Sequence, residues 1–202
     1  RLEGAKEDFT KTIEMMPEMF MAYVERGRVH DSLGNREAAY EDYRRALELR
    51  PDYHPGYAPY GMYAFMQEDW ETAAEMFRKA FEREPRAYNY PLLTALSHRE
   101  AGRDEAARTY IESVLADIPR DTLYYDMARY YLTPQGDSSL LRKIERSDDA
   151  VVKAQLLFHF GALYELEGRV RLAQTMYVEV EDQGGPAVIE KRLAARKLEG
   201  DD

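Results

Sequence analysis

A fixed 34-residue spacing constrains this chain more than any other feature of its sequence. The step is shared by four prolines, Pro17, Pro51, Pro85 and Pro119. It is also kept by small and bulky apolar positions: Ala5, Ala39, Ala73 and Ala107; Phe9, Tyr43, Phe77 and Ile111; Gly27, Gly61 and Ala95; Ala46, Ala80 and Val114. Self-similarity at such a period indicates stacked copies of one small unit, because a single unit cannot bury its apolar face alone.

Each copy has the pattern of two helices. Residues 18–33 carry apolar side chains at helical spacing and are followed by the turn dipeptide Gly34-Asn35. Residues 36–49 carry a second apolar stripe with steps of three and four, and Pro51 cannot continue that helix. We therefore expect turns near residues 34, 51, 68, 85, 102, 119 and 168. The small residues Gly27, Gly61 and Ala39 would let the two helices approach closely.

The repeat continues beyond residue 119 with one irregular copy. A shift of 66 residues from Ala95 and Ala107 leads to Gly161 and Ala173, so one intervening copy is two residues short. Residues 122–149 hold that copy, in which several tyrosines suggest a first helix and the sequence Thr-Pro-Gln-Gly at 133–136 interrupts it. Only a short second helix fits after the interruption, so this copy is interpreted as degenerate.

These positions resemble the tetratricopeptide repeat, with Arg26 and Pro91 as departures from the usual residues. The resemblance implies an all-α fold, a right-handed superhelical solenoid of helix-turn-helix repeats with about eleven or twelve helices. We expect one continuous solenoid with the following segments: 1–16 as the second helix of a truncated repeat, with its partner helix upstream; 20–53, 54–87 and 88–121 as repeats; 122–149 as a degenerate repeat; 150–183 as a repeat; and 184–202 as a capping helix and tail.

Composition and motifs argue against several functional classes. The 202 residues include no cysteine, which excludes disulfides and thiolate chemistry, and the formal net charge of −10 argues against nucleic-acid binding. No sequence motif for a catalytic or phosphate-binding site occurs, and His30 and His98 share one repeat position that is interpreted as structural. We therefore expect no enzyme activity, no catalytic residue, no metal site and no cofactor.

The leading interpretation is a scaffold that binds a protein or peptide partner. If the small residues of each first helix face the second helix, a neighbouring stripe lines the concave side of the solenoid. Its predicted members are Val24, Arg28, Met62, Phe65, Met66, Leu92, Leu96 and Arg99. The centre of this predicted groove is apolar and its margins are basic, which suits a peptide or helix with an acidic flank. The stripe could instead pack against the helix at 187–197, another helix of the chain, or a second subunit.

A closer resemblance concerns compartment and partner. Residues 23–34, the segment from Tyr88 to Asp104, and the order of full, degenerate and final repeats are similar to the NlpI-type lipoproteins. Those proteins are dimeric periplasmic adaptors for peptidoglycan hydrolases in the bacterial outer membrane. The resemblance implies a periplasmic location, a possible homodimer, and membrane attachment only through a lipid anchor upstream of Arg1. The alternatives are a cytoplasmic tetratricopeptide adaptor, a co-chaperone-like module, or a non-catalytic subunit of an enzyme complex.

Overall fold

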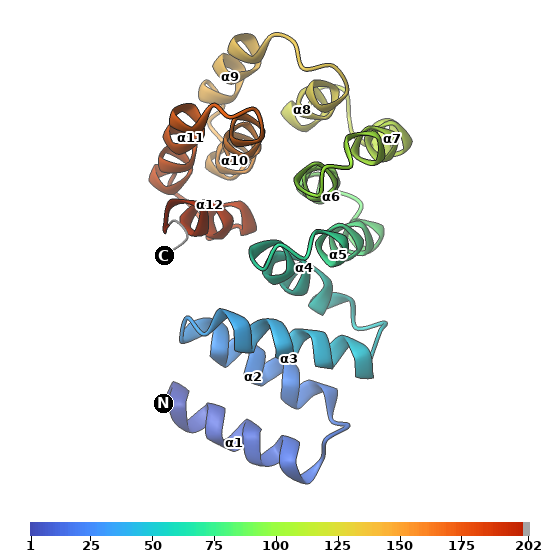
Figure 1. Cartoon of the computed structure of the whole chain (residues 1–202), viewed down its shortest axis with the longest axis vertical. Coiled ribbons are helices and arrows are strands. Elements are labelled where there is room, and N and C mark those ends of the chain that lie inside the picture. The colour runs from blue at the N-terminus through green and yellow to red at the C-terminus, as the bar shows by residue number, and fades with distance from the viewer. Residues whose placement is uncertain (200–202) are drawn as a thin grey trace. The chain divides into compact units, whose positions relative to one another are not determined.

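The computed structural model describes residues 1–199, and every regular element in that range is helical (Figure 1). The chain divides into two compact units, one of residues 1–83 and the other beginning at Glu84. The boundary lies near the end of the predicted repeat 54–87, and each unit is described by itself. The expected all-α repeat fold is confirmed, whereas the continuity of one solenoid stays a prediction.

Unit 1 is a stack of helices joined by short turns. Its elements are α1 (Leu2–Met15), α2 (Phe20–Ser32), α3 (Arg36–Leu49), a 3-10 turn (His54–Gly56), α4 (Tyr57–Met66) and α5 (Trp70–Arg83). Each helix contacts the next one in the chain. Arg26 of α2 donates two hydrogen bonds to the buried carboxylate of Asp42 in α3, at 2.9 and 2.7 Å. This bidentate ion pair explains the departure from the usual aliphatic residue at position 26.

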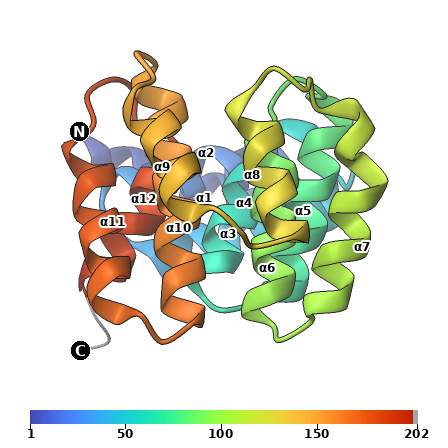
Figure 2. The same cartoon turned by 90° about the horizontal axis from the view of Figure 1, so that it is seen from above.

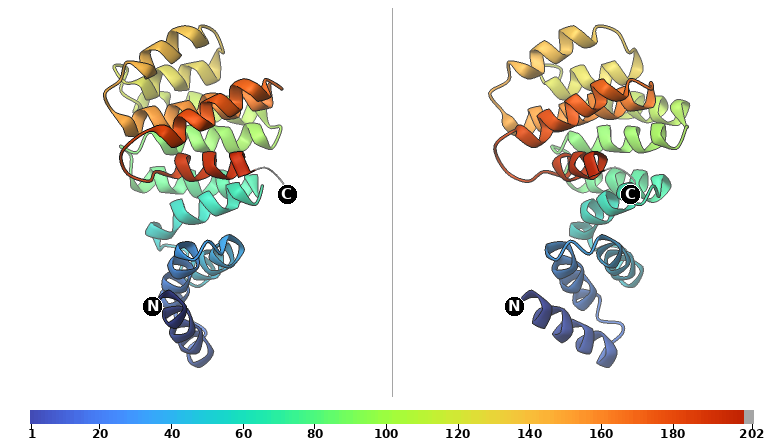
Figure 3. Two further views of the ribbon diagram at one scale, coloured as in Figure 1. Left: turned by 90° about the vertical axis from the view of Figure 1, so that its left-hand side faces the viewer. Right: turned by 60° about the vertical axis from the view of Figure 1, so that its left-hand side comes forward.

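Unit 2 contains seven α-helices within its described residues. They are α6 (Asn89–Glu100), α7 (Asp104–Val114, followed by a 3-10 turn at Leu115–Asp117), α8 (Leu123–Leu132), α9 (Asp137–Glu145), α10 (Ala150–Leu166), α11 (Val170–Asp182) and α12 (Ile189–Glu199). Besides sequential contacts, α6 and α8 both contact α10. Helix α12 packs on α10 and α11 (Figure 2), and Figure 3 shows the loop through which α11 turns into α12.

The turns within the repeats confirm the predicted period. Left-handed backbone occurs at Gly34, Glu68, Gly102, Gly136 and Gly168, with φ values of 76°, 60°, 69°, 77° and 74°. The first four positions are 34 residues apart and the last step is 32, as the shortened copy requires. Glycine adopts this conformation without steric cost, whereas Glu68 carries a side chain there.

The small residues of the first helices lie where two helices approach closely. A Cβ atom added to Gly61 would lie 3.1 Å from Met76 Cβ, and one added to Gly161 would lie 2.6 Å from Tyr177 Cε1. These contacts leave no room for a side chain and confirm the packing role predicted from the repeat. Trp70 packs edge-on against Phe65 with ring centroids 4.8 Å apart, in agreement with a structural role.

Candidate functional site

The apolar residues predicted to line a concave groove are mostly covered within the chain. Val24 is 1% exposed and belongs to a core cluster with Tyr23 and Ala46. Met62 and Phe65 are each 3% exposed, and Met66 is half-buried. Leu92 and Leu96, also predicted to line the groove, are both 0% exposed. The expectation of an open apolar stripe therefore needs correction: packed core surrounds these side chains, and a binding role for them stays a prediction.

The two basic residues predicted at the groove margins pair with acids close to them in the sequence. Arg28 is exposed and its Nη1 lies 2.8 Å from Glu25 Oε1, one turn earlier in α2. Arg99 is partly buried and its Nε lies 3.0 Å from Asp104 Oδ1 at the start of α7. Exposed pairs of this kind are weak, so both guanidinium groups could still meet another carboxylate.

No arrangement for catalysis or metal binding is found among residues 1–199. The described residues contain no group of three or more potential metal ligands. His159 of α10 is fully buried, and its Nδ1 lies 2.9 Å from the hydroxyl of Tyr131 in α8. Burial lowers the pKa of this imidazole to about 3, which keeps it neutral. Burial also lowers the pKa values of His30 and His98, in keeping with the structural interpretation of that repeat position.

The degenerate repeat differs from the other copies at the aligned packing positions. Arg129 stands at the position held by Gly27, Gly61, Ala95 and Gly161, counted with the short copy. Leu141 replaces the alanine of the second helix, and Glu145 replaces the bulky apolar residue that packs on the glycine. In the structure Arg129 and Glu145 are exposed. Leu140 and Ile144 of α9 are buried instead, each one residue before an aligned packing position, and α8 and α9 remain in contact.

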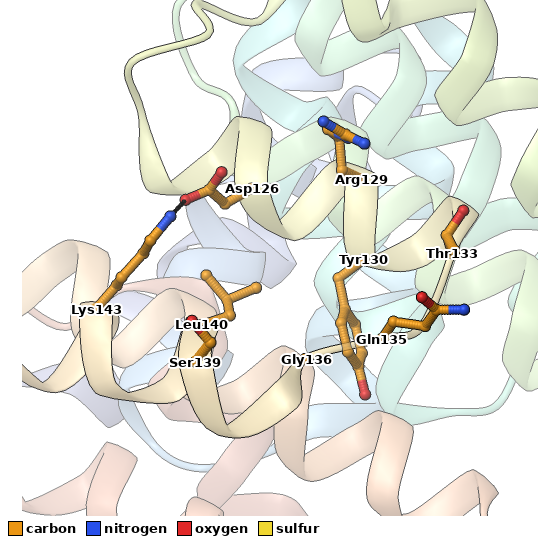
Figure 4. Close-up of a pocket in the computed structure, with 9 residues that line it drawn as sticks. All are labelled: Asp126, Arg129, Tyr130, Thr133, Gln135, Gly136, Ser139, Leu140 and Lys143. Carbon is orange, nitrogen blue, oxygen red and sulfur yellow. Dashed lines mark hydrogen bonds and ion pairs between the residues drawn. The ribbon is translucent and has the colours of Figure 1, made fainter.

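An open cleft lies between these two helices, with a volume of about 390 Å³ (Figure 4). Asp126 of α8 and Lys143 of α9 point toward each other across it, with Lys143 Nζ 2.7 Å from Asp126 Oδ2. Arg129 is exposed on the α8 side. The complete lining, named the α8–α9 cleft, is Asp126, Arg129, Tyr130, Thr133, Gln135, Gly136, Ser139, Leu140 and Lys143.

The floor of the cleft is held by contacts to the following repeat. Tyr130 is 7% exposed and its ring packs against Phe160 of α10, with centroids 5.1 Å apart. Burial raises the pKa of this phenol. At the start of α9, the Asp137 carboxylate accepts a hydrogen bond of 3.3 Å from Tyr164 of α10. The cleft is therefore framed by ordered side chains.

A second hollow of about 440 Å³ adjoins the cleft and shares Asp126 and Lys143 with it. Its other lining residues are Arg120, Asp121, Thr122, Leu123 and Arg146. The two hollows together present four cationic side chains against two carboxylates, on a chain with a net charge of −10. Within the described chain, Arg120, Arg129 and Arg146 form no ion pair. The surface is therefore locally basic and open to an acidic group.

The sequence predicts residues 122–149 as a degenerate repeat and places no binding residue there, although these residues carry a signal for the cleft. The signal is the combination of Arg129, Leu141 and Glu145 at three packing positions. Polar or bulky residues at these positions oppose the close approach of two helices, so a cleft is favoured at this copy.

Comparison with known proteins supports the repeat assignment. Residues 22–53 and 61–122 match two tetratricopeptide repeat families. No functionally described protein matches the sequence significantly. None of the described helices is long and apolar enough to span a bilayer.

Several solved structures share the fold at low sequence identity. A tetratricopeptide repeat protein from Parabacteroides merdae ATCC 43184 aligns over 98% of this chain and 78% of its own, with a TM-score of 0.55 and 18% identity. MamA aligns over 96% and 91%, with a TM-score of 0.50 and 14% identity. A chain of Naa15/Naa10 bound to HypK-THB aligns over 97% and 32%, with a TM-score of 0.54 and 14% identity.

Proposed function

Because the chain belongs to the tetratricopeptide-repeat family, we propose that it is a non-enzymatic scaffold that binds a segment of a partner protein at the α8–α9 cleft. Repeats of this family are generally non-catalytic interaction modules. The absence of a metal-ligand cluster among residues 1–199 is compatible with that role. The fold neighbours support a protein-interaction scaffold, and the proposed site rests on the side chains of this chain.

The observation that carries the proposal is the unpaired basic rim of the cleft. Arg129 occupies a repeat position that is held by glycine or alanine in the other copies, and its side chain is exposed at the cleft. Arg120 and Arg146 border the adjoining hollow. Guanidinium groups bind carboxylates in a bidentate geometry, and a cluster of them raises the local concentration of acidic partners. The partner segment is therefore acidic.

The test uses a fluorescent peptide of six glutamates, with a peptide of six lysines as the opposite probe. We expect the acidic peptide to bind the unmodified chain at low ionic strength and the basic peptide not to bind. Arg129→Glu should weaken the acidic peptide at least about tenfold, because the substitution replaces attraction with repulsion. Arg86→Glu, at another exposed arginine of unit 2, is the matched control. Equal losses in both variants would leave only a net-charge effect and would overturn the proposed site.

A cell-envelope adaptor role is a finer form of the same function. It rests on the resemblance of residues 23–34 and of the segment from Tyr88 to Asp104 to NlpI-type lipoproteins. In that form the partner is a peptidoglycan hydrolase, the protein is periplasmic and dimeric, and an upstream lipid holds it at the membrane. Fractionation of cells that make the full-length protein tests the location, and sedimentation tests the dimer. Recovery in the cytoplasmic fraction would favour a cytoplasmic adaptor instead.

A further inference from the structure

The C-terminal helix α12 packs on α10 and α11 and reaches α6 through polar side chains at its two ends. Near its start, Glu190 accepts a hydrogen bond of 3.0 Å from Asn89 Nδ2 in α6. Near its end, Lys197 Nζ lies 3.5 Å from Glu100 Oε1 in α6 and 2.8 Å from Glu165 Oε2 in α10. Helix α12 is therefore held at both ends by helices from two different repeats.

The groups that hold α12 form a polar frame, named here the α12 seat: Asn89, Glu100, Gln155 and Glu165. Gln155 of α10 is 6% exposed. Burial raises the pKa of the Glu190 carboxyl to about 7, and hydrogen bonding to Asn89 and Gln155 partly opposes this rise. The seat thus offers amides to an acid at one end and carboxylates to a cation at the other. These matching ends define the direction in which a helix lies on it.

Helix α12 buries few apolar side chains for a helix of eleven residues. Only Glu190, Leu193 and Ala194 are buried in it, whereas α10 buries an unbroken run from Ala154 to Tyr164. One of the three is a carboxyl group at 0% exposure whose Oε2 atom has no hydrogen-bond partner. A buried polar atom without a partner opposes burial, so it offsets part of the gain from Leu193. The linker before α12 contains Gly184-Gly185-Pro186, which leaves the helix tethered by a short, turn-rich segment.

We propose that the α12 seat is a second interaction surface, which α12 occupies within the chain and which an amphipathic helix of a partner protein occupies in its place. The partner helix carries the pattern that α12 presents. An acid is followed by a leucine three positions later, a small residue four positions later, and a lysine seven positions later. Glu190, Leu193, Ala194 and Lys197 have that spacing and lie on one helical face. This surface is separate from the α8–α9 cleft and adds a second mode of binding.

The tether sets the competition between the two occupants. A segment linked by a few residues competes as if present at millimolar concentration, so a free helix binds weakly while α12 is seated. Release of α12 removes this competition without altering the seat. The prediction can be tested without knowing any partner, because α12 itself supplies the probe.

The probe is a fluorescent peptide with the sequence of residues 187–199, titrated against the full chain. Leu193→Glu places a charge at a site that is 1% exposed and should release α12. We expect the peptide to bind the Leu193→Glu chain at least about tenfold more tightly than the unmodified chain. Leu198→Glu, at a position 39% exposed on the same helix, should behave like the unmodified chain. A second peptide in which Glu190 and Lys197 exchange places should bind the released chain at least about tenfold more weakly.

Two results would overturn the proposal. One is a folded Leu193→Glu chain that does not bind the peptide, or binds it no better than the unmodified chain does. If Leu193→Glu does not fold, hydrogen exchange on the unmodified chain decides. The amides of α12 should exchange faster than those of α10. Exchange of both helices in a single global opening would show that α12 is part of the core. No acidic probe is used, so failure of the α8–α9 cleft would leave this result unaffected.

Discussion

The helix pairs α10–α11 and α8–α9 are neighbouring copies of one repeat with opposite properties. In α10–α11, Gly161 lies against the ring of Tyr177 so closely that an added Cβ would be 2.6 Å away. In α8–α9, the matching positions are Arg129 and Glu145, both exposed, and an open cleft lies between the two helices beside their contact. The difference teaches that a small residue at this position lets a helix pair pack closely, whereas an arginine there leaves an open, polar surface.

The largest expected effect is at the closed pair. Gly161→Leu forces a side chain into the Tyr177 ring and should destabilise the fold by about 3 kcal/mol or more, the upper end of overpacking effects. Urea unfolding monitored by circular dichroism measures the change. Gly184→Ala is the control, because no atom lies within 4 Å of its added Cβ. An unchanged midpoint for Gly161→Leu would show that the α10–α11 contact is not close.

The junction between the two pairs should weaken in acid. His159 of α10 contacts Tyr131 of α8, and its pKa falls from an ordinary value near 6.5 to about 3 in the fold. The unfolded chain therefore takes up a proton first, and this contribution to stability, complete above pH 6.5, is lost as the pH falls toward 3. The slope should reach about 1.4 kcal/mol per pH unit.

Comparison with His159→Gln isolates that titration from those of the carboxylates. The glutamine variant stays neutral throughout, so its free energy of unfolding should fall less steeply between pH 6.5 and 4. Parallel pH profiles for the two proteins would contradict a buried, neutral His159.

A regular pair in unit 1 extends the same rule. In Gly61→Leu, the new Cβ atom would lie only 3.1 Å from Met76 Cβ, with the rest of the side chain beyond it. We expect the free energy of unfolding to fall by about 1–3 kcal/mol. The cost is smaller than at Gly161 because the nearest atoms are less close. A thermal melt that matches the unmodified protein would remove Gly61 from the set of helix contacts.

A gain of stability is expected at the turn between α4 and α5. Glu68 has a φ of 60°, whereas the matching turns of the other repeats hold glycine. Glu68→Gly should stabilise the fold by up to about 1 kcal/mol, since relief of the left-handed strain exceeds the added entropy of the unfolded chain. Gly34→Glu, the reverse change in the first repeat, should destabilise it. A loss of stability in Glu68→Gly would show that its side chain contributes more than the strain costs.

The smallest expected effect is at the open pair. Arg129→Ala should change the free energy of unfolding by less than about 0.5 kcal/mol, because the side chain is exposed and forms no ion pair within residues 1–199. Chemical denaturation measures this, and titration with the hexaglutamate peptide should show weaker binding. A large loss of stability would mean that Arg129 packs as part of the core, and the contrast with Gly161 would fail.

Much of the fold could be predicted because the relevant contacts are local and periodic. The 34-residue period located the turns at Gly34, Glu68 and Gly102, and it revealed the missing two residues before Gly168. The candidate site was harder to predict. The helical face of Leu92 and Leu96 could be assigned from spacing, but spacing does not reveal what covers that face. The cleft at Arg129 was within reach of the sequence, since the repeat positions were already aligned.

By itself, the sequence determined the all-α repeat class, the order of helices and turns, and the close helix contacts at Gly61 and Gly161. These properties depend on residues within one repeat, where side-chain volume and turn conformation act over a few residues. Only the tertiary structure decided that the apolar stripe is buried, that a cleft opens between α8 and α9, and that Glu190 and Lys197 of α12 meet α6 about a hundred residues away. Such contacts join distant parts of the chain, and their free energy depends on which surfaces the folded backbone brings together.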